Sequence, residues 1–195
     1  ILPLGDERLQ INDQVFVIVK TGQVPQVVHA LGQSGRRLDN VMILGGSKVG
    51  ERVARELCGG GRKQRMRVKL VEPDRTRAHE LAEQIEGVLV IHGDPSDIDL
   101  LAIEGLQEMD AVAAVTDDEE SNLVSCLMAK HLGVRKTVAL LSKSAYVPIS
   151  QSIGLDAAVS QKLAVRREVL RFLRGTRVRS VATVQGLDAE LLEVE

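Results

Sequence analysis

The feature that most constrains the fold is a short apolar run that leads directly into a glycine-rich segment. Residues 41–50 read Val-Met-Ile-Leu-Gly-Gly-Ser-Lys-Val-Gly. Gly45 permits a tight turn after a buried strand, Gly50 lets the next helix pack closely on that strand, and backbone amides at the helix start can cradle a phosphate. The segment therefore predicts a strand, a nucleotide-binding loop and a helix. The alternative is a tight turn that has lost its ligand.

The same alternation of apolar runs and amphipathic helices continues through residues 38–162. After the first strand at 41–44, further strands are predicted at 68–71, 88–91, 111–115, 138–141 and 157–159. Between them, apolar residues recur at helical spacing around 49–57, 78–85 and 123–130. Strands that alternate with helices are typical of βαβ units. We therefore predict an α/β fold, a Rossmann-type parallel sheet of about six strands, with short β-containing flanking segments.

The flanking segments follow other patterns. Residues 9–19 predict a small hairpin, because β-branched residues lie on both sides of the turn pair Asn12-Asp13. Residues 22–37 predict a linker helix that two glycines interrupt. Residues 160–174 predict a basic amphipathic helix, and 178–184 and 191–194 predict two further strands.

Composition excludes several classes of function. The chain has 25 Lys and Arg against 27 Asp and Glu, a net charge of −2, and only three aromatic residues. It thus has neither the positive electrostatic field nor the aromatic stacking surfaces that nucleic-acid binding needs. Cys58 and Cys126 lie in apolar helical patterns, which predicts buried, reduced thiols. No His or Cys spacing supports a transition-metal site, although the acidic run at 117–120 leaves a divalent metal as an alternative.

Glu72 ends the second predicted strand, 22 residues after Gly50. An acidic side chain at this place commonly accepts hydrogen bonds from both ribose hydroxyls of a dinucleotide. Such a role favours NAD over NADP, because a 2′-phosphate would meet a negative charge. Arg75 and Arg77 lie nearby and would weaken that preference unless they are solvated. The alternative for Glu72 itself is a solvated carboxylate.

Two more polar loops follow predicted strands. Residues 92–95 come after the third strand and 116–122 after the fourth, so both lie at the carboxyl edge of the sheet, where such folds bind ligands. Thr116 and Glu119 also match a capping box, and Asp117 and Asp118 suit a helix N-terminus. The second loop is therefore open to both a binding and a capping interpretation.

The sequence offers no catalytic arrangement. The four histidines fall in the linker, on a helix surface, at a strand end and at a helix end, and none is paired with a nucleophile. A dehydrogenase also needs a substrate domain, which the about 33 residues after Lys162 cannot build. We predict a protein that binds a nucleotide without chemistry. The rival is a fragment of a Rossmann oxidoreductase.

Taken in order, five motifs resemble the TrkA family, the NAD-binding regulatory proteins of Trk-type bacterial potassium uptake, among the regulators of potassium conductance. They are residues 45–50, 68–72, 92–94, 115–119 with Asn122, and Tyr146 ahead of 153–156. The resemblance implies a site for NAD(H), with ATP or ADP possible, formed by Gly45, Gly46, Ser47, Lys48, Val49, Gly50, Glu72, Asp94, Thr116 and Asn122. Two departures are Ser47, where a glycine is usual, and Gln161-Lys162, where a proline is usual. Ser47 either reduces the room for pyrophosphate or donates its hydroxyl to it.

The resemblance also implies an organisation and a set of partners. Residues 1–21 would end a preceding small β-containing lobe, 22–37 would be the linker helix, 38–162 the nucleotide-binding domain, and 163–195 a connecting helix and the start of a C-terminal lobe. The implied protein is cytoplasmic and forms a ring of regulatory domains that gates a membrane potassium transporter subunit from the inner face of the cell membrane. Separately, the apolar strands at 15–19 and 178–184 and the apolar stripe of the helix at 160–174 predict at least a homodimer. The cytosolic domain of a related potassium channel or efflux protein is a further alternative.

Overall fold

The computed structural model describes residues 8, 10, 17, 19–31, 38–59, 66–143, 145–173, 178–184 and 189–194. The chain divides into two compact units, residues 1–37 and 38–195. In the first unit a 3-10 turn, η1 (Thr21–Gln23), leads into the helix α1 (Val24–Ala30), which has Pro25 in its first turn. Most of the hairpin predicted at 9–19 lies outside the described residues.

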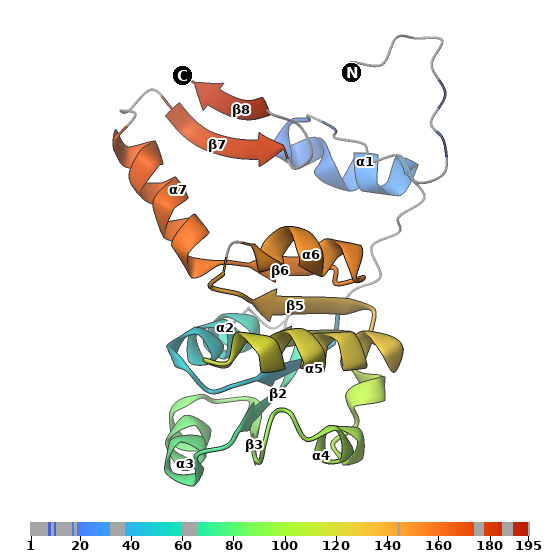
Figure 1. Ribbon diagram of the computed structural model, residues 1–195, viewed down its shortest axis with the longest axis vertical. Coiled ribbons are helices and arrows are strands. Elements are labelled where there is room, and N and C mark those ends of the chain that lie inside the picture. The colour runs from blue at the N-terminus through green and yellow to red at the C-terminus, as the bar shows by residue number, and fades with distance from the viewer. Residues whose placement is uncertain are drawn as a thin grey trace. The chain divides into compact units, whose positions relative to one another are not determined.

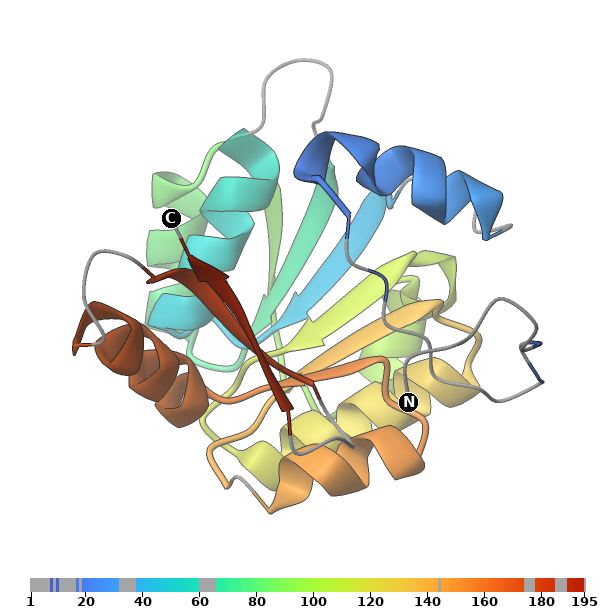
Figure 2. The same cartoon turned by 90° about the horizontal axis from the view of Figure 1, so that it is seen from above.

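The second unit contains a six-stranded sheet in the order β3-β2-β1-β4-β5-β6, and every adjacent pair is parallel. Figure 2 shows these strands side by side with helices around them. The strands are β1 (Asn40–Leu44), β2 (Arg67–Glu72), β3 (Val88–His92), β4 (Ala111–Ala114), β5 (Lys136–Leu140) and β6 (Ala157–Val159). The predicted Rossmann-type sheet is confirmed, and this strand order is the one that Rossmann folds adopt.

Helices cover both faces of the sheet (Figure 1). The helices α2 (Lys48–Gly59) and α3 (Arg75–Gln84) contribute to one apolar cluster, and α4 (Ile98–Ile103) and α5 (Glu119–His131) to the other. The turn η2 (Leu106–Glu108) follows α4, and α6 (Tyr146–Ser152) precedes β6. The apolar pattern of the sequence did not predict α4, η2 or α6.

The central strand β1 shows why the sheet forms here. Met42 and Leu44 belong to the cluster on the α4 and α5 side, whereas Val41 and Ile43 belong to the cluster on the α2 and α3 side. All four side chains are at least 95% buried. Because each large apolar side chain contributes about 1.5–3 kcal/mol when fully buried, an unbroken apolar run is favoured in a strand that is covered on both faces.

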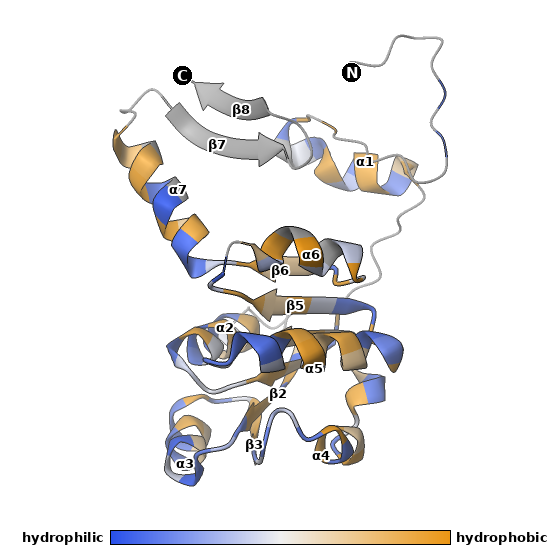
Figure 3. Ribbon diagram, viewed as in Figure 1, coloured by the Kyte–Doolittle hydropathy of each residue, from blue (hydrophilic) through white to orange (hydrophobic). Residues whose placement is uncertain are grey.

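After β6 the chain continues as α7 (Gln161–Leu173), followed by an antiparallel pair, β7 (Val178–Val184) and β8 (Ala189–Val194). Figure 3 shows apolar and polar residues interspersed along α7. Leu163 is half-buried, whereas apolar side chains further along α7 are exposed, Leu170 by 42% and Leu173 by 72%. In the described part of the chain, no helix combines the length and the apolar content needed to cross a bilayer.

Candidate functional site

The order of the strands places a crevice at the carboxyl edge of the sheet. The chain leaves β1 toward β2 and later returns to the other side of β1 as β4, so the loops after β1 and β4 diverge there. A pocket of about 630 Å³ lies at this edge and is lined from four strand ends. Its lining comprises Gly45, Gly46, Ser47, Glu72, Pro73, Asp74, Arg77, Asp94, Pro95, Ser96, Thr116, Asp117, Asp118 and Ser121.

Two glycines fix the shape of the loop after β1. Gly45 has φ +106°, and its amide donates to the carbonyl of Val71 at 2.8 Å. A Cβ on Gly50 would lie 2.0 Å from the carbonyl oxygen of Gly45. No side chain fits there, so the first turn of α2 comes close to the end of β1. A helix N-terminus beside a glycine loop is a place where phosphates commonly bind.

Ser47 interacts with the neighbouring strand end. Its hydroxyl donates to the carbonyl oxygen of Val115 at 3.0 Å and accepts from the amide of Gly50 at 3.4 Å. The hydroxyl thus ties the loop after β1 to the end of β4. In this rotamer it has already donated its proton within the protein.

Glu72, at the end of β2, is only 8% exposed. One carboxylate oxygen accepts from the amide of Gly46 at 2.6 Å, and the other accepts from the amide of Asp74 at 2.9 Å. Burial excludes the solvated alternative. A carboxylate has about four acceptor positions, so two further donors can still be accepted.

The pocket is markedly acidic. Its lining includes the carboxylates of Glu72, Asp74, Asp94, Asp117 and Asp118. Asp94 accepts from both the hydroxyl and the amide of Ser96, at 2.6 and 2.8 Å, and these bonds lower the pKa of Asp94. The anionic groups of a ligand would therefore depend on the loop amides rather than on side chains.

Arg77 is the one basic residue of that lining. From the sequence we expected it only to weaken the preference for NAD over NADP. Its Nε donates to the carbonyl of Gly46 at 3.2 Å, Nη2 to Glu51 at 2.6 Å and Nη1 to Glu80 at 3.2 Å. The side-chain hydrogen bond from Arg77 is the main cause that lowers the pKa of Glu51. Glu51 lies on another helix, so no local sequence pattern points to this pair, although the spacing of Arg77 and Glu80 does suggest their contact.

Thr116 and Asn122 form a local network at the end of β4. Asn122 is 1% exposed, accepts from the amide and hydroxyl of Thr116, and donates to the carbonyls of Thr116 and Leu140. Asn122 therefore holds the ends of β4 and β5 together and does not line the pocket, whereas Thr116 does.

The predicted capping box of Thr116 and Glu119 is wrong. The N-cap of α5 is Asp118, which accepts from the amide of Glu120, and the Glu119 carboxylate instead accepts from the amide of Lys143 at 2.9 Å. Asp118 caps the helix in place of Thr116, so α5 begins at Glu119.

A smaller hollow of about 370 Å³ adjoins the glycine loop. Ser47, Thr116 and Asp117 line both hollows, whereas Lys48 and Val49 line only this one. Its far wall includes Gln161, the first residue of α7. The crevice edge therefore reaches from the end of β3 to the start of α7.

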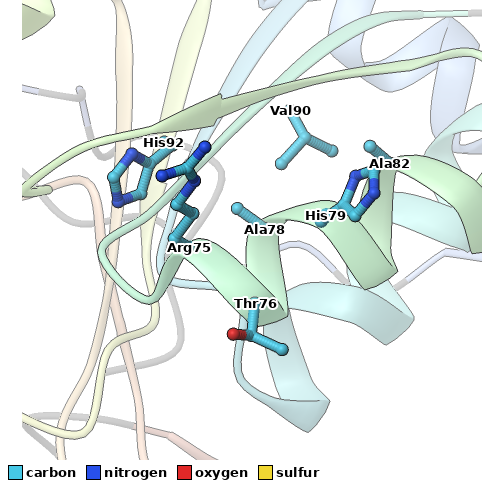
Figure 4. A pocket seen from close by; sticks show the side chains of 7 residues that line it. All are labelled: Arg75, Thr76, Ala78, His79, Ala82, Val90 and His92. Atoms are coloured by element: carbon cyan, nitrogen blue, oxygen red, sulfur yellow. The ribbon is translucent and has the colours of Figure 1, made fainter.

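A third hollow, of about 510 Å³, lies between α3 and β3 and shares no lining residue with the crevice (Figure 4). Ala78 and Ala82 face Val90, and these small side chains leave the space between helix and strand unfilled. Arg75 and His92 lie at one end and His79 at the other. None of the residues predicted for the nucleotide site lines this hollow.

Within the described residues, no group of three or more His, Cys, Asp or Glu side chains is placed to hold a metal ion. Cys58 and Cys126 are both buried and form no disulfide, as predicted. Burial raises the pKa of Cys126 to about 12, so this thiol stays protonated at neutral pH.

Comparison with known proteins connects this geometry with a family. A family model described as the TrkA-N domain matches residues 41–161. The chain belongs to the TrkA-N family. The match spans the sheet from β1 to β6 and ends at the first residue of α7, so the family domain coincides with the part of the chain that forms the crevice.

The chain is also similar to part of several proteins that are named for potassium uptake. It is 33% identical over 193 residues to Trk system potassium uptake protein TrkA homolog 2 of Methanosarcina mazei, covering 99% of this chain and 42% of that protein. It is 32% identical over 194 residues to TrkA of Haemophilus influenzae, covering 100% and 41%. The chain thus spans less than half the length of these relatives.

Solved structures support the same fold. The TrkA-N domain of the inner membrane protein YbaL from Escherichia coli matches with a TM-score of 0.61 and 17% identity, over 70% of this chain and 97% of that one. The GsuK channel bound to NAD matches with a TM-score of 0.58 and 20% identity, over 83% and 29%. The AMP-bound Kef C-terminal domain of Shewanella denitrificans matches with a TM-score of 0.55 and 20% identity, over 70% and 83%.

Proposed function

We propose that this TrkA-N domain binds NAD(H) in the crevice as a regulatory ligand and leaves it chemically unchanged. The observation that carries the proposal is the buried carboxylate of Glu72, bonded to the amide of Gly46 at 2.6 Å beside a loop that accepts no side chain at Gly50. A carboxylate with acceptor positions to spare suits ribose hydroxyls, and loop amides suit the pyrophosphate. Asp94 and Thr116 line the same pocket.

The charge of the crevice supports a dinucleotide as the main ligand. Five carboxylates and one guanidinium line it, so each added phosphate on a ligand meets more repulsion. NADH carries two phosphate charges, both on its pyrophosphate, which is fewer than ADP or ATP carries. We therefore rank NAD(H) first, with ADP or ATP as weaker ligands.

The relatives supply the biological setting of the proposal. Proteins named for potassium uptake are similar over the full chain, and the structural neighbours include a channel bound to NAD and a domain bound to AMP. We infer a regulatory subunit that lies in the cytoplasm at the inner face of the membrane and gates a potassium transporter there. Residues 163–195 would then begin a second lobe, and α7 would take part in self-association.

Calorimetry with NADH, NADPH, ADP and ATP tests the ligand. For the intact chain we expect NADH to bind most tightly and more tightly than NADPH. Glu72→Ala should weaken NADH binding by about 1.5–3 kcal/mol, roughly tenfold or more, because hydrogen bonds to a charged acceptor are lost. Glu83→Ala is the matched control, since Glu83 is 71% exposed on α3 and pairs only with His79 among the ion pairs described.

Equal NADH titrations for the intact chain and Glu72→Ala would remove Glu72 from the site. Absence of NADH binding by the intact chain, with tight binding of ATP, would contradict the choice of dinucleotide. Circular dichroism of each variant shows whether the fold is retained, because Glu72 also holds the amides of Gly46 and Asp74.

A further inference from the structure

The ribose end of the crevice is the part lined by Glu72, Asp74 and Arg77. Its one cation, Arg77, is held by carboxylates from two helices. Arg77 reaches Glu51 at the start of α2 and Glu80 one turn further along α3. The side chain of Arg77 is 28% exposed and that of Glu51 is 24% exposed, so this ion pair is partly shielded from water. The third nitrogen, Nε, is bonded to the carbonyl of Gly46.

The position of Arg77 matters because it lies beside the carboxylate that would bind ribose. Arg77 donates to the carbonyl of Gly46, while Glu72 accepts from the amide of the same residue. The two side chains thus approach the glycine loop at one residue, and both line the pocket. A free arginine near a ribose carboxylate would attract a 2′-phosphate.

In this chain the guanidinium is committed elsewhere. Each of its three nitrogens has a protein acceptor, and two of those acceptors are carboxylates outside the pocket lining. Their charges offset the positive charge of Arg77, although Glu51 also pairs with Arg55 at 2.9 Å. Glu72 and Asp74 add two more negative charges at the same end. A 2′-phosphate there would meet an overall negative field.

We propose that Glu51 and Glu80 set the nucleotide selectivity of the crevice by occupying the guanidinium of Arg77 and offsetting its charge, so that 2′-phosphorylated dinucleotides are excluded. Arg77 acts as the selectivity switch, and Glu51 is its main positioning residue. The inference rests on the proposed NAD(H) function and adds the residues that decide between NADH and NADPH.

The test is calorimetric binding of NADH and NADPH to the intact full chain and to four variants of it. Glu51→Gln should tighten NADPH binding by roughly five- to tenfold while NADH binding changes by less than about twofold, since freeing one partly shielded charge has an effect of this size. Glu56→Gln is the matched control, because Glu56 lies one turn later on α2 and pairs with Arg52 at the exposed surface. Glu56→Gln should change the affinity for neither NADH nor NADPH.

A double variant separates release of Arg77 from simple removal of a negative charge. Adding Arg77→Met to Glu51→Gln should abolish the gain in NADPH binding. If the double variant keeps the gain, or if Glu51→Gln leaves the ratio of the two affinities unchanged, the proposal is overturned. Glu80→Gln gives a second reading, with a smaller gain expected because Glu80 is more exposed and its contact is longer.

Failure of the inference is distinguishable from failure of the proposed function. If the intact chain binds NADH and the Glu51 and Glu80 variants do not alter selectivity, only the role of the arginine cluster is refuted. If the intact chain binds neither NADH nor NADPH, the proposed ligand itself is refuted, and the selectivity proposal with it.

Discussion

Single residues differ in how far the sequence reveals their roles. Glu72 is predicted by its spacing from Gly50, and the structure places it in the crevice. The family resemblance implies that Asn122 binds the nucleotide, yet its amide nitrogen donates to the carbonyls of Thr116 and Leu140 at the ends of β4 and β5. Arg77 was missed as a central residue because its partner Glu51 comes from another helix, and contacts between helices leave no local pattern.

Asp110 lies just before β4, at the amino edge of the sheet, and we expect its contacts there to be sensitive to acid. Its carboxylate accepts from the amides of Asn40 and Asp39, at 2.9 and 2.8 Å, and pairs with Arg135, which lowers its pKa from 3.8 to about 2. A depressed folded pKa means that the stabilisation is complete above about pH 4 and is lost as the pH falls toward 2.

We therefore expect Asp110→Asn to lower the melting temperature at neutral pH and to flatten its decline between about pH 4 and 2. Melting curves followed by circular dichroism across this range provide the measurement. Asp99→Asn, at an exposed position on α4, is the control. A decline as steep in Asp110→Asn as in the intact chain would mean that other carboxylates carry the acid sensitivity.

At the scale of elements, the six strands were predicted to within about two residues at each end, because each is a short apolar run bounded by turn or helix signals. The run is fully buried in most of β1, whereas the edge strands β3 and β6 contain no buried residue. The short elements α4 and α6 were not predicted. α4 has six residues and α6 has seven, too few for a helical period to stand out. They form because tertiary contacts hold them, such as the fully buried Leu101 of α4.

The helix α7 carries the prediction on assembly. Val169, Leu170 and Leu173 are exposed by 50%, 42% and 72% on a helix rich in arginine. We expect the chain to be at least a dimer through this helix, and we expect Leu170→Asp with Leu173→Asp to produce monomer or insoluble protein, because buried unpaired carboxylates are strongly unfavourable. Light scattering at tens of micromolar measures the mass.

Ile103→Asp is the control for that experiment, since Ile103 is an apolar residue of α4 that is 83% exposed. Its mass should equal that of the intact chain. A monomeric intact chain, or an unchanged mass in the double α7 variant, would place any interface elsewhere.

On the scale of the whole molecule, the crevice and α7 belong to one compact unit, and the smaller hollow reaches the first residue of α7. A ligand at the crevice edge and a partner on α7 would therefore act on adjoining parts of the same unit. The fold was predictable because one strong motif and a regular alternation agree. The organisation beyond this chain was not, since it spans less than half of its relatives.

The central claim is that the domain binds NAD(H) without transforming it. The most direct measurement is titration of the full chain with NADH, followed by nicotinamide fluorescence, with chromatography of the nucleotide recovered after incubation with common keto and aldehyde compounds. The account predicts saturable binding, loss of most of that binding in Glu72→Ala, and recovery of intact NADH. Protein-dependent oxidation of NADH that requires one of those compounds would contradict it.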